Sequence, residues 1–330
     1  MGESHTMSRY ARQIILPEVG ASGQKALTDA HVLVVGAGGL GVPVLQYLVG
    51  AGIGRITLVD GDVVDESNLH RQTLYGQSWV GKPKAEAAKE ILHNLNSECV
   101  VTPVVTFLDP VNVHDLIQDI DIALDCADSF AASYILSDTC LAQNIPLISA
   151  SALGLAGYVG GFCGGAPSLR ALFPDLPDRA QSCATAGVLG PVVGTIGAMQ
   201  AQMALSVLLN LKPSPLGQLV RFDAATFRSS SFRFDAAPEP ENIPYTFIAS
   251  SQINDTDYVV ELRGDIEAPT PVTPNALRAN AQEFGQNEPL PQQGQRAVMC
   301  CKSGLRAWTA ANRLNDIWDG QIVLVAMGDN

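Results

Sequence analysis

Residues 31–41, HVLVVGAGGLG, join an apolar run directly to a glycine-rich turn, and they decide the fold. An apolar helical pattern follows, and a second apolar run, ITLVD at 56–60, ends in Asp60. Strand, Gly-x-Gly-x-x-Gly turn, helix, strand and carboxylate are the parts of a mononucleotide-binding βαβ unit. Glycines let the backbone approach a phosphate, and Asp60 can accept a hydrogen bond from a ribose hydroxyl. The turn glycines are Gly36, Gly38, Gly39 and Gly41. The unit predicts a nucleotide-binding α/β domain, but it does not separate NAD from ATP.

Several polar and charged residues follow Asp60. An enzyme that only transfers a hydride does not need so many of them near the phosphates. These residues are Asp62, Asn68, Arg71, Gln72 and Lys84. An enzyme that attacks the α-phosphate of ATP does need such a set, because it must neutralise the triphosphate, hold Mg²⁺ and release pyrophosphate. A further carboxylate, Asp128, follows the apolar run 122–124, at the strand edge where ligands of open α/β sheets bind. These residues favour adenylyl chemistry over a dehydrogenase.

The stretches that carry this chemistry resemble the ThiF/MoeB/HesA family, the bacterial relatives of ubiquitin-activating enzymes. The matching stretches are 9–16 (RYARQIIL), 36–41 (GAGGLG), 60–62 (DGD), 67–72 (SNLHRQ), 81–84 (GKPK), 125–128 (DCAD), 186–188 (AGV) and 190–191 (GP). The resemblance covers residues 7–235, and it implies a Rossmann-like ATP-binding domain with a mostly parallel sheet.

The resemblance also implies an activity and a set of roles. Such enzymes adenylate the C-terminal Gly-Gly carboxylate of a small ubiquitin-like sulfur-carrier protein. The implied roles are phosphate binding for Gly36, Gly38 and Gly41, ribose binding for Asp60, triphosphate contacts for Asn68, Arg71 and Lys84, and Mg²⁺ binding near the α-phosphate for Asp128. Arg12 would reach across a homodimer interface to the γ-phosphate in the neighbouring subunit. We place Gln72 in the same nucleotide site, while Asp62 fits either the ligand network or a turn.

Composition restricts the class of protein. The chain has 330 residues and a net charge of −13, which predicts one large domain with a small one and argues against nucleic acid as a partner. The N-terminal MGESHT lacks the apolar core of a signal peptide, and the seven cysteines do not form a secreted disulfide pattern. We therefore expect a cytoplasmic enzyme.

The apolar segment 187–209 is long enough to span a membrane, but Pro191 and four glycines favour a buried helix instead.

Cys183 stands in the sequence AQSCATAG, after a loop rich in Pro and Asp. The resemblance places here the thiol that accepts the activated acyl group or joins it as an acyl-disulfide. An idle structural cysteine is the alternative.

The sequence departs from the family at its zinc site, which needs two CxxC pairs. The corresponding stretches read GAPSLRA at 165–171 and AAPEPE at 236–241, and neither contains a thiol. Four thiolates are required for a structural zinc of that kind, so we predict none.

Residues 236–252 are rich in Pro and Glu and predict a linker, followed by a second domain at 253–330. Its stretch RAVMC at 296–300 leads into CKSGLR at 301–306 and then into a helical pattern. This resembles the active-site loop of rhodaneses, which are sulfurtransferases. The loop residues are Cys301, Lys302, Ser303, Gly304, Leu305 and Arg306. Successive N–H groups, the helix dipole and Arg306 would lower the thiol pKa and stabilise a persulfide.

The second resemblance is partial. The region is about half the size of a usual domain, its first signature is only Glu261-Leu-Arg263, and the segment that closes the family's fold is absent after residue 329. A shortened sulfurtransferase domain and a degenerate remnant both fit.

Both resemblances together predict a two-step activating enzyme. ATP adenylates the carrier, and persulfide sulfur on Cys301, direct or relayed through Cys183, then displaces AMP to give a thiocarboxylate. A cysteine desulfurase is the expected kind of sulfur donor. Two alternatives stay open: an adenylating enzyme of another substrate, such as a tRNA base or a small carboxylate, and a non-catalytic module that binds carriers.

Overall fold

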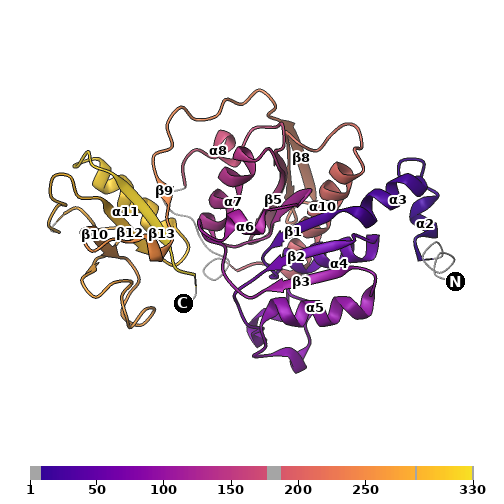
Figure 1. Ribbon diagram of the computed structural model, residues 1–330, viewed down its shortest axis with the longest axis horizontal. Helices are drawn as coiled ribbons and strands as arrows, with labels where there is room; N and C mark the ends of the chain where they lie inside the picture. The colour runs from indigo at the N-terminus through magenta and orange to yellow at the C-terminus, as the bar shows by residue number, and fades with distance from the viewer. Residues whose placement is uncertain (1–8, 177–186, 287, 329–330) are drawn as a thin grey trace.

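The structure is a computed structural model that describes residues 9–176, 187–286 and 288–328. It contains an eight-stranded sheet of order β3-β2-β1-β4-β5-β6-β7-β8 and a five-stranded sheet of order β11-β10-β12-β13-β9 (Figure 1). Strands β1 to β5 run parallel, and β6, β7 and β8 continue the first sheet antiparallel. The predicted α/β fold with a mostly parallel sheet is confirmed.

The first sheet consists of β1 (His31–Val35), β2 (Arg55–Val59), β3 (Val100–Val104), β4 (Ile122–Asp125), β5 (Pro146–Leu153), β6 (Ala156–Cys163), β7 (Gln218–Asp223) and β8 (Arg228–Arg233). The helices are α2 (Ala11–Ile14), α3 (Gly20–Asp29), α4 (Gly41–Ala51), α5 (Lys84–Leu95), α6 (Val113–Leu116), α7 (Phe130–Ala142), α8 (Leu169–Leu172), α10 (Gly190–Leu208) and α11 (Leu305–Asn315). Short 3₁₀ turns lie at Glu66–Asn68, Gln77–Trp79 and Ser250–Gln252.

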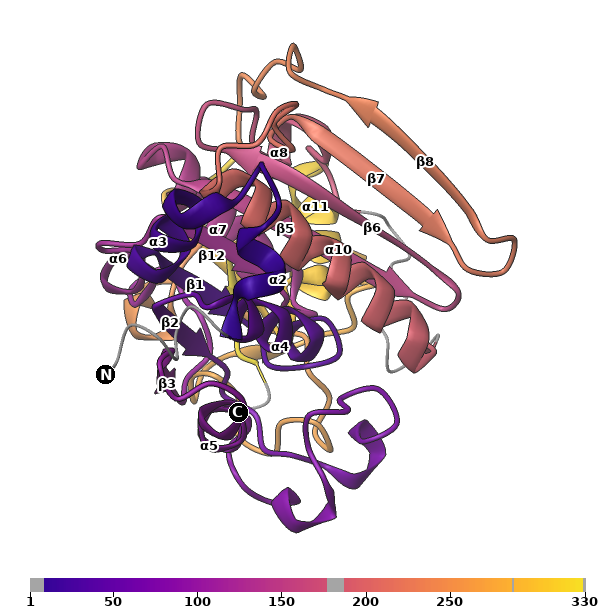
Figure 2. The same ribbon diagram turned by 90° about the vertical axis from the view of Figure 1, so that its right-hand side faces the viewer.

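Helices cover both faces of the first sheet, which explains why its central strands are apolar throughout. Val32 and Val34 of β1 face α4 and α10, while Leu33 and Val35 face α7 in a second core cluster (Figure 1). The strands β7 and β8 extend from the edge of the sheet, and every residue of β8 is exposed (Figure 2).

Helix α10 is the helix that the sequence predicts for the apolar segment 187–209. By length and composition it could cross a membrane, and among the described residues it is the one helix of that kind. It packs against α4 and against β4, β5 and β6, with Val192, Val193 and Ile196 in the core. It is therefore the central helix on one face of the sheet.

The second sheet is parallel throughout and consists of β9 (Thr246–Phe247), β10 (Tyr258–Glu261), β11 (Leu277–Arg278), β12 (Ala297–Cys301) and β13 (Ile322–Ala326). Strand β9 pairs with β13, although its residues lie inside the segment 236–252 that the sequence predicts as a linker. A strand of only two residues carries too short a pattern to be predicted from the sequence. The division into 7–235 and a shortened rhodanese-like domain at 253–330 stays a prediction.

Candidate active site

The glycine turn lies where the strand order reverses, between β1 and β4. A Cβ atom on Gly36, whose φ is +100°, would lie 2.6 Å from the carbonyl oxygen of Cys126, in the turn that follows β4. A Cβ atom on Gly41 would lie 1.9 Å from the Gly36 carbonyl oxygen. No side chain caps the start of α4, so its first N–H groups are suited to a phosphate. This cradle fits the predicted ATP.

Asp60, at the end of β2, supports the glycine turn. The Ala37 N–H donates to its Oδ2 at 2.6 Å, and the Asp62 N–H donates to its Oδ1 at 2.8 Å. Burial raises the pKa of Asp60, while the nearby Lys84 ammonium lowers it. The carboxylate holds the turn in shape, and its ribose contact stays a prediction.

Lys84 is the first residue of α5, and it forms a buried ion pair with Asp62. The Nζ–Oδ2 distance is 2.8 Å, and the Lys84 side chain is 6% exposed against 34% for Asp62. An ammonium withdrawn from water in this way acts strongly on nearby charge. Asp62 is therefore the partner of this lysine, which the sequence left open.

Tyr75 is a site residue that the sequence analysis missed. Its buried hydroxyl donates to the Ala37 carbonyl at 3.0 Å and also lies 3.3 Å from the Lys84 carbonyl. It thereby ties the glycine turn to the start of α5. Burial raises its pKa, so the hydroxyl keeps its proton. A tyrosine in a run of ordinary loop residues carries no signal from which these two partners could be predicted.

Gln72 faces the glycine turn, and its neighbours Asn68 and Arg71 lie on the same short segment. Gln72 is buried, and its Nε2 donates to Asn68 Oδ1 at 3.3 Å. Its Oε1 has no hydrogen-bond partner among the described residues, and its amide faces Gly38. A buried amide oxygen without a donor is suited to receive one from a ligand. The Arg71 guanidinium, half-buried, donates to the Ser67 carbonyl at 3.3 Å.

The turn after β4 separates two carboxylates with different environments. Asp125 is fully buried and accepts hydrogen bonds from Ser149 Oγ at 2.7 Å and from the Ala127 N–H at 3.2 Å. Burial raises its pKa. The Gln200 Nε2 donates to the Asp125 carbonyl at 2.7 Å. Asp128 is exposed. The buried groups fix the turn, and the exposed Asp128 stays the predicted magnesium-binding carboxylate.

Arg12 does not reach the glycine turn of its own chain. It lies on α2, beside the C-terminal end of α4, where Gln13 Nε2 donates to the Ala51 carbonyl at 3.0 Å. The glycine turn lies at the N-terminal end of α4. Since α4 has 11 residues, each adding about 1.5 Å, the two ends are about 16 Å apart. A role of Arg12 in the site therefore requires a second subunit.

Cys301 ends β12 and is fully buried. Its Sγ accepts hydrogen bonds from the N–H groups of Gly304 at 3.1 Å and Ala307 at 3.3 Å. Arg306 pairs with Glu267 at 2.7 and 2.5 Å. Burial raises the pKa of Cys301 more than the N–H groups and Arg306 lower it. The predicted lowering of the Cys301 pKa is thus wrong for this arrangement, because the sequence showed the N–H donors and Arg306 but not the burial. Cys300 is also buried, in a different core cluster.

Cys183, the second predicted thiol, lies outside the described residues.

The loops that would hold a zinc ion are joined here by hydrogen bonds. Glu239 accepts from the Ser168 N–H at 2.7 Å and from Ser168 Oγ at 2.5 Å. Ser168 lies in the first of the two stretches where the family has cysteines, and Glu239 lies in the second. Among the described residues, no group of three or more His, Cys, Asp or Glu side chains could hold a metal ion. These donors do not fit zinc, whose absence stays a prediction.

Replacing Glu239 by Ala should lower the melting temperature, because the buried Ser168 loses both acceptors. The expected loss is about 2 kcal/mol, or roughly 5 °C in Tm. Differential scanning fluorimetry measures it, with the exposed Glu241→Ala as the matched control. EDTA should leave the wild-type Tm unchanged. Equal Tm values for both variants, or a large fall with EDTA, would contradict this role of Glu239.

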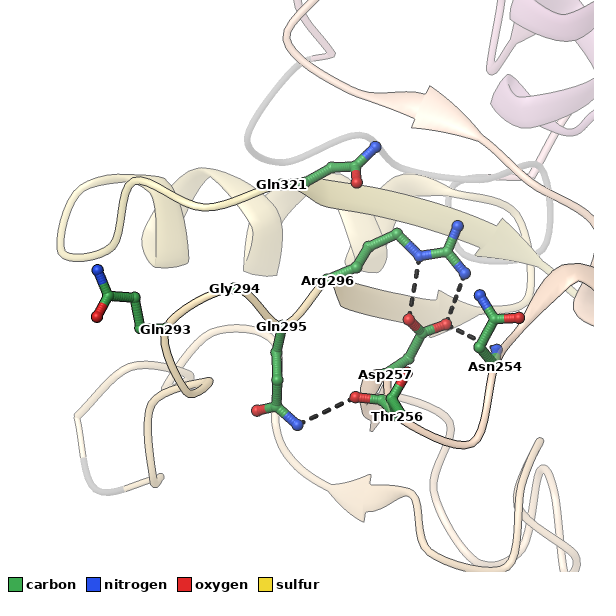
Figure 3. Close-up of a pocket in the computed structure, with 8 residues that line it drawn as sticks. All are labelled: Asn254, Thr256, Asp257, Gln293, Gly294, Gln295, Arg296 and Gln321. Atoms are coloured by element: carbon green, nitrogen blue, oxygen red, sulfur yellow. Dashed lines mark hydrogen bonds and ion pairs between the residues drawn. The ribbon is translucent and has the colours of Figure 1, made fainter.

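One cavity lies away from these residues, beside the second sheet. It has a volume of about 450 Å³ and is lined by polar side chains around the Arg296–Asp257 ion pair, which is 2.6 Å long (Figure 3). Arg296 and Asp257 precede β12 and β10, at the amino edge of the second sheet, whereas Cys301 ends β12 at its carboxyl edge. The cavity is thus separate from the candidate thiol.

Residues 10–243 match the model of the ThiF family. The chain is 47% identical over 203 residues to the adenylyltransferase and sulfurtransferase UBA4 of Yarrowia lipolytica, covering 61% of this chain and 51% of that protein. It is 40% identical over 231 residues to the SAMP-activating enzyme E1 of Haloferax volcanii, covering 69% of this chain and 86% of that protein. The chain spans about half the length of UBA4 and of the related MOCS3 of Bos taurus.

Solved structures resemble the same part of the chain. The crystal structure of E. coli MccB with ATP has a TM-score of 0.61 and 25% identity, covering 70% of this chain and 72% of that one. MccB with AMPCPP and MccA has a TM-score of 0.63 and 25% identity, covering 72% and 75%.

Proposed function

Because this chain belongs to the ThiF family, we propose that it adenylates the C-terminal Gly-Gly carboxylate of a small ubiquitin-like sulfur-carrier protein. One observation carries the proposal: the glycine turn, the buried Lys84–Asp62 pair and the Asp128 turn meet at the switch point of the first sheet. The names of the relatives in Yarrowia and Haloferax support the same chemistry.

In the proposed reaction, a carboxylate oxygen of the carrier attacks the α-phosphorus of ATP. A P–O bond forms, the bond to the β-phosphate breaks, and pyrophosphate leaves. Lys84 and Arg71 offset the charge that develops on the phosphates, and the turn glycines hold the triphosphate. Asp128 would hold Mg²⁺, which would supply further neutralisation of the phosphate charge.

The sulfur step uses Cys301 as a persulfide. The terminal sulfur attacks the acyl carbon, and AMP leaves with the electron pair of the broken C–O bond. A second thiol, for which Cys183 is the candidate, then attacks the Cys301 sulfur and releases the thiocarboxylate. A cysteine desulfurase is the proposed donor. We further propose a cytoplasmic homodimer, in which Arg12 completes the partner's site.

The test is ATP–pyrophosphate exchange with several carriers that end in Gly-Gly. Wild type and Cys301→Ala should exchange equally, because adenylation precedes the sulfur step. Asp128→Ala should lose exchange by roughly 100-fold or more. Exchange that depends on tRNA or on a small carboxylate would show that this other substrate is the one adenylated. No exchange with any substrate would favour a non-catalytic binding module.

A further inference from the structure

The loop that carries Cys301 is bound to the first turn of α7, next to Asp128. The Ser303 carbonyl accepts hydrogen bonds from the Ala131 N–H at 3.2 Å and from Ser129 Oγ at 3.3 Å. Ser129 is the N-cap residue of α7, but its side chain does not cap the helix. The second unit thus supplies an acceptor that the helix start requires.

Packing around this contact is close. A Cβ atom on Gly304 would lie 3.2 Å from the Ala131 Cβ and 2.9 Å from the Phe247 ring. The loop can approach α7 because residue 304 has no side chain. Behind it, the Trp308 ring stacks on Tyr134 of α7 with the centroids 6.0 Å apart. The contact is therefore a fitted interface between the two units.

We propose that this contact is a latch, which shields Cys301 from other proteins while it is closed and must open before the thiol can be loaded. The argument is steric. Cys301 is 0% exposed, so no sulfur of another protein can reach it. Loading requires the Cys301 thiolate to attack the outer sulfur of a donor persulfide, which breaks the donor S–S bond and releases the donor thiolate. Given the proposed function, loading and delivery beside Asp128 then take place in different positions of the second unit.

Two features suit such an opening. The segment 241–244 is exposed and precedes Tyr245, while Glu239 is held to Ser168, so the chain can bend between the two units (Figure 1). The Trp308 Nε1–H is buried at the interface and has no acceptor among the described residues. A buried donor without an acceptor disfavours the closed state, which lowers the cost of opening.

Alkylation of Cys301 tests the latch without ATP or a carrier. The experiment uses the full chain with Cys183→Ala, iodoacetamide as the probe, and peptide mapping of Cys301 at pH 8. Ala131→Lys places a long side chain where the loop packs, and it should speed alkylation by roughly tenfold or more, as expected when a minor open state becomes dominant. Leu141→Lys, an exposed change on the same helix, should not.

Ser129→Ala is the milder second variant, which removes one hydrogen bond and should speed alkylation by roughly fivefold. Wild-type alkylation as fast as that of the urea-unfolded chain would overturn the proposal, as would equal rates for Ser129→Ala, Ala131→Lys and Leu141→Lys. Because the readout needs no catalysis, its failure is distinct from a failure of pyrophosphate exchange.

Discussion

Replacing Lys84 by Met should reduce carrier-dependent pyrophosphate exchange by roughly 100-fold or more. The side chain is nearly buried, so its charge is weakly screened and acts on phosphates that approach the glycine turn. Methionine keeps the length of the side chain but removes the cation. Asp62 then loses its partner, and Asp60 loses the ammonium that lowers its pKa. Asp62 would then face the triphosphate as a carboxylate without its cation.

Lys82→Met is the matched control, since it removes a charge two residues away. Lys82 is exposed, and its Nζ lies 4.5 Å from the centroid of the Trp79 ring. Its loss should leave exchange within roughly twofold of wild type, because exposed charges are screened. Circular dichroism on both variants separates lost chemistry from lost structure. Equal exchange by folded Lys84→Met and Lys82→Met would remove Lys84 from the site.

Replacing Gly41 by Ala should damage both folding and nucleotide binding. The new Cβ would lie 1.9 Å from the Gly36 carbonyl oxygen, a backbone atom that cannot rotate away. The start of α4 must then separate from the turn at Gly36. We expect a loss of about 3 kcal/mol, or roughly 6–12 °C in Tm, with ATP no longer raising the Tm.

Gly50→Ala, near the other end of α4, is the control for the chemical change itself. Space around Gly50 is open to 4 Å, and the residue is exposed. Alanine there should stabilise the helix by about 0.5–1 kcal/mol, because glycine is a poor helix former. Calorimetry with and without ATP measures both variants. A Gly41→Ala protein as stable as Gly50→Ala would contradict the close packing of the turn.

Local sequence predicts the nucleotide-binding unit well. The unit is contained within 30 residues, 31–60. It combines the glycine spacing in 36–41, an apolar run on either side and the terminal Asp60, and together these predict one kind of βαβ unit. The elements β1, α4, β2, β4 and α10 follow from such local patterns. The pairing of Lys84 with Asp62 is less local, and the sequence left the role of Asp62 open for that reason.

Other site residues act through partners far along the chain. Ser149 and Gln200 hold Asp125 from β5 and α10, and Tyr75 joins two backbone segments. The loop that carries Cys301 is bound to α7, some 170 residues earlier, as the Ser129–Ser303 bond shows. No local sequence pattern predicts such contacts. The lowered Cys301 pKa predicted from the loop residues alone was therefore wrong.

The intact mass of a carrier after incubation with this chain, ATP and Mg²⁺ tests the central claim most directly. The account predicts that a carrier ending in Gly-Gly gains the mass of one adenylyl group, which is AMP less one water, and that the same carrier without its last two glycines gains none. A carrier that stays unmodified while ATP is consumed, or AMP that appears on both carriers, would contradict it.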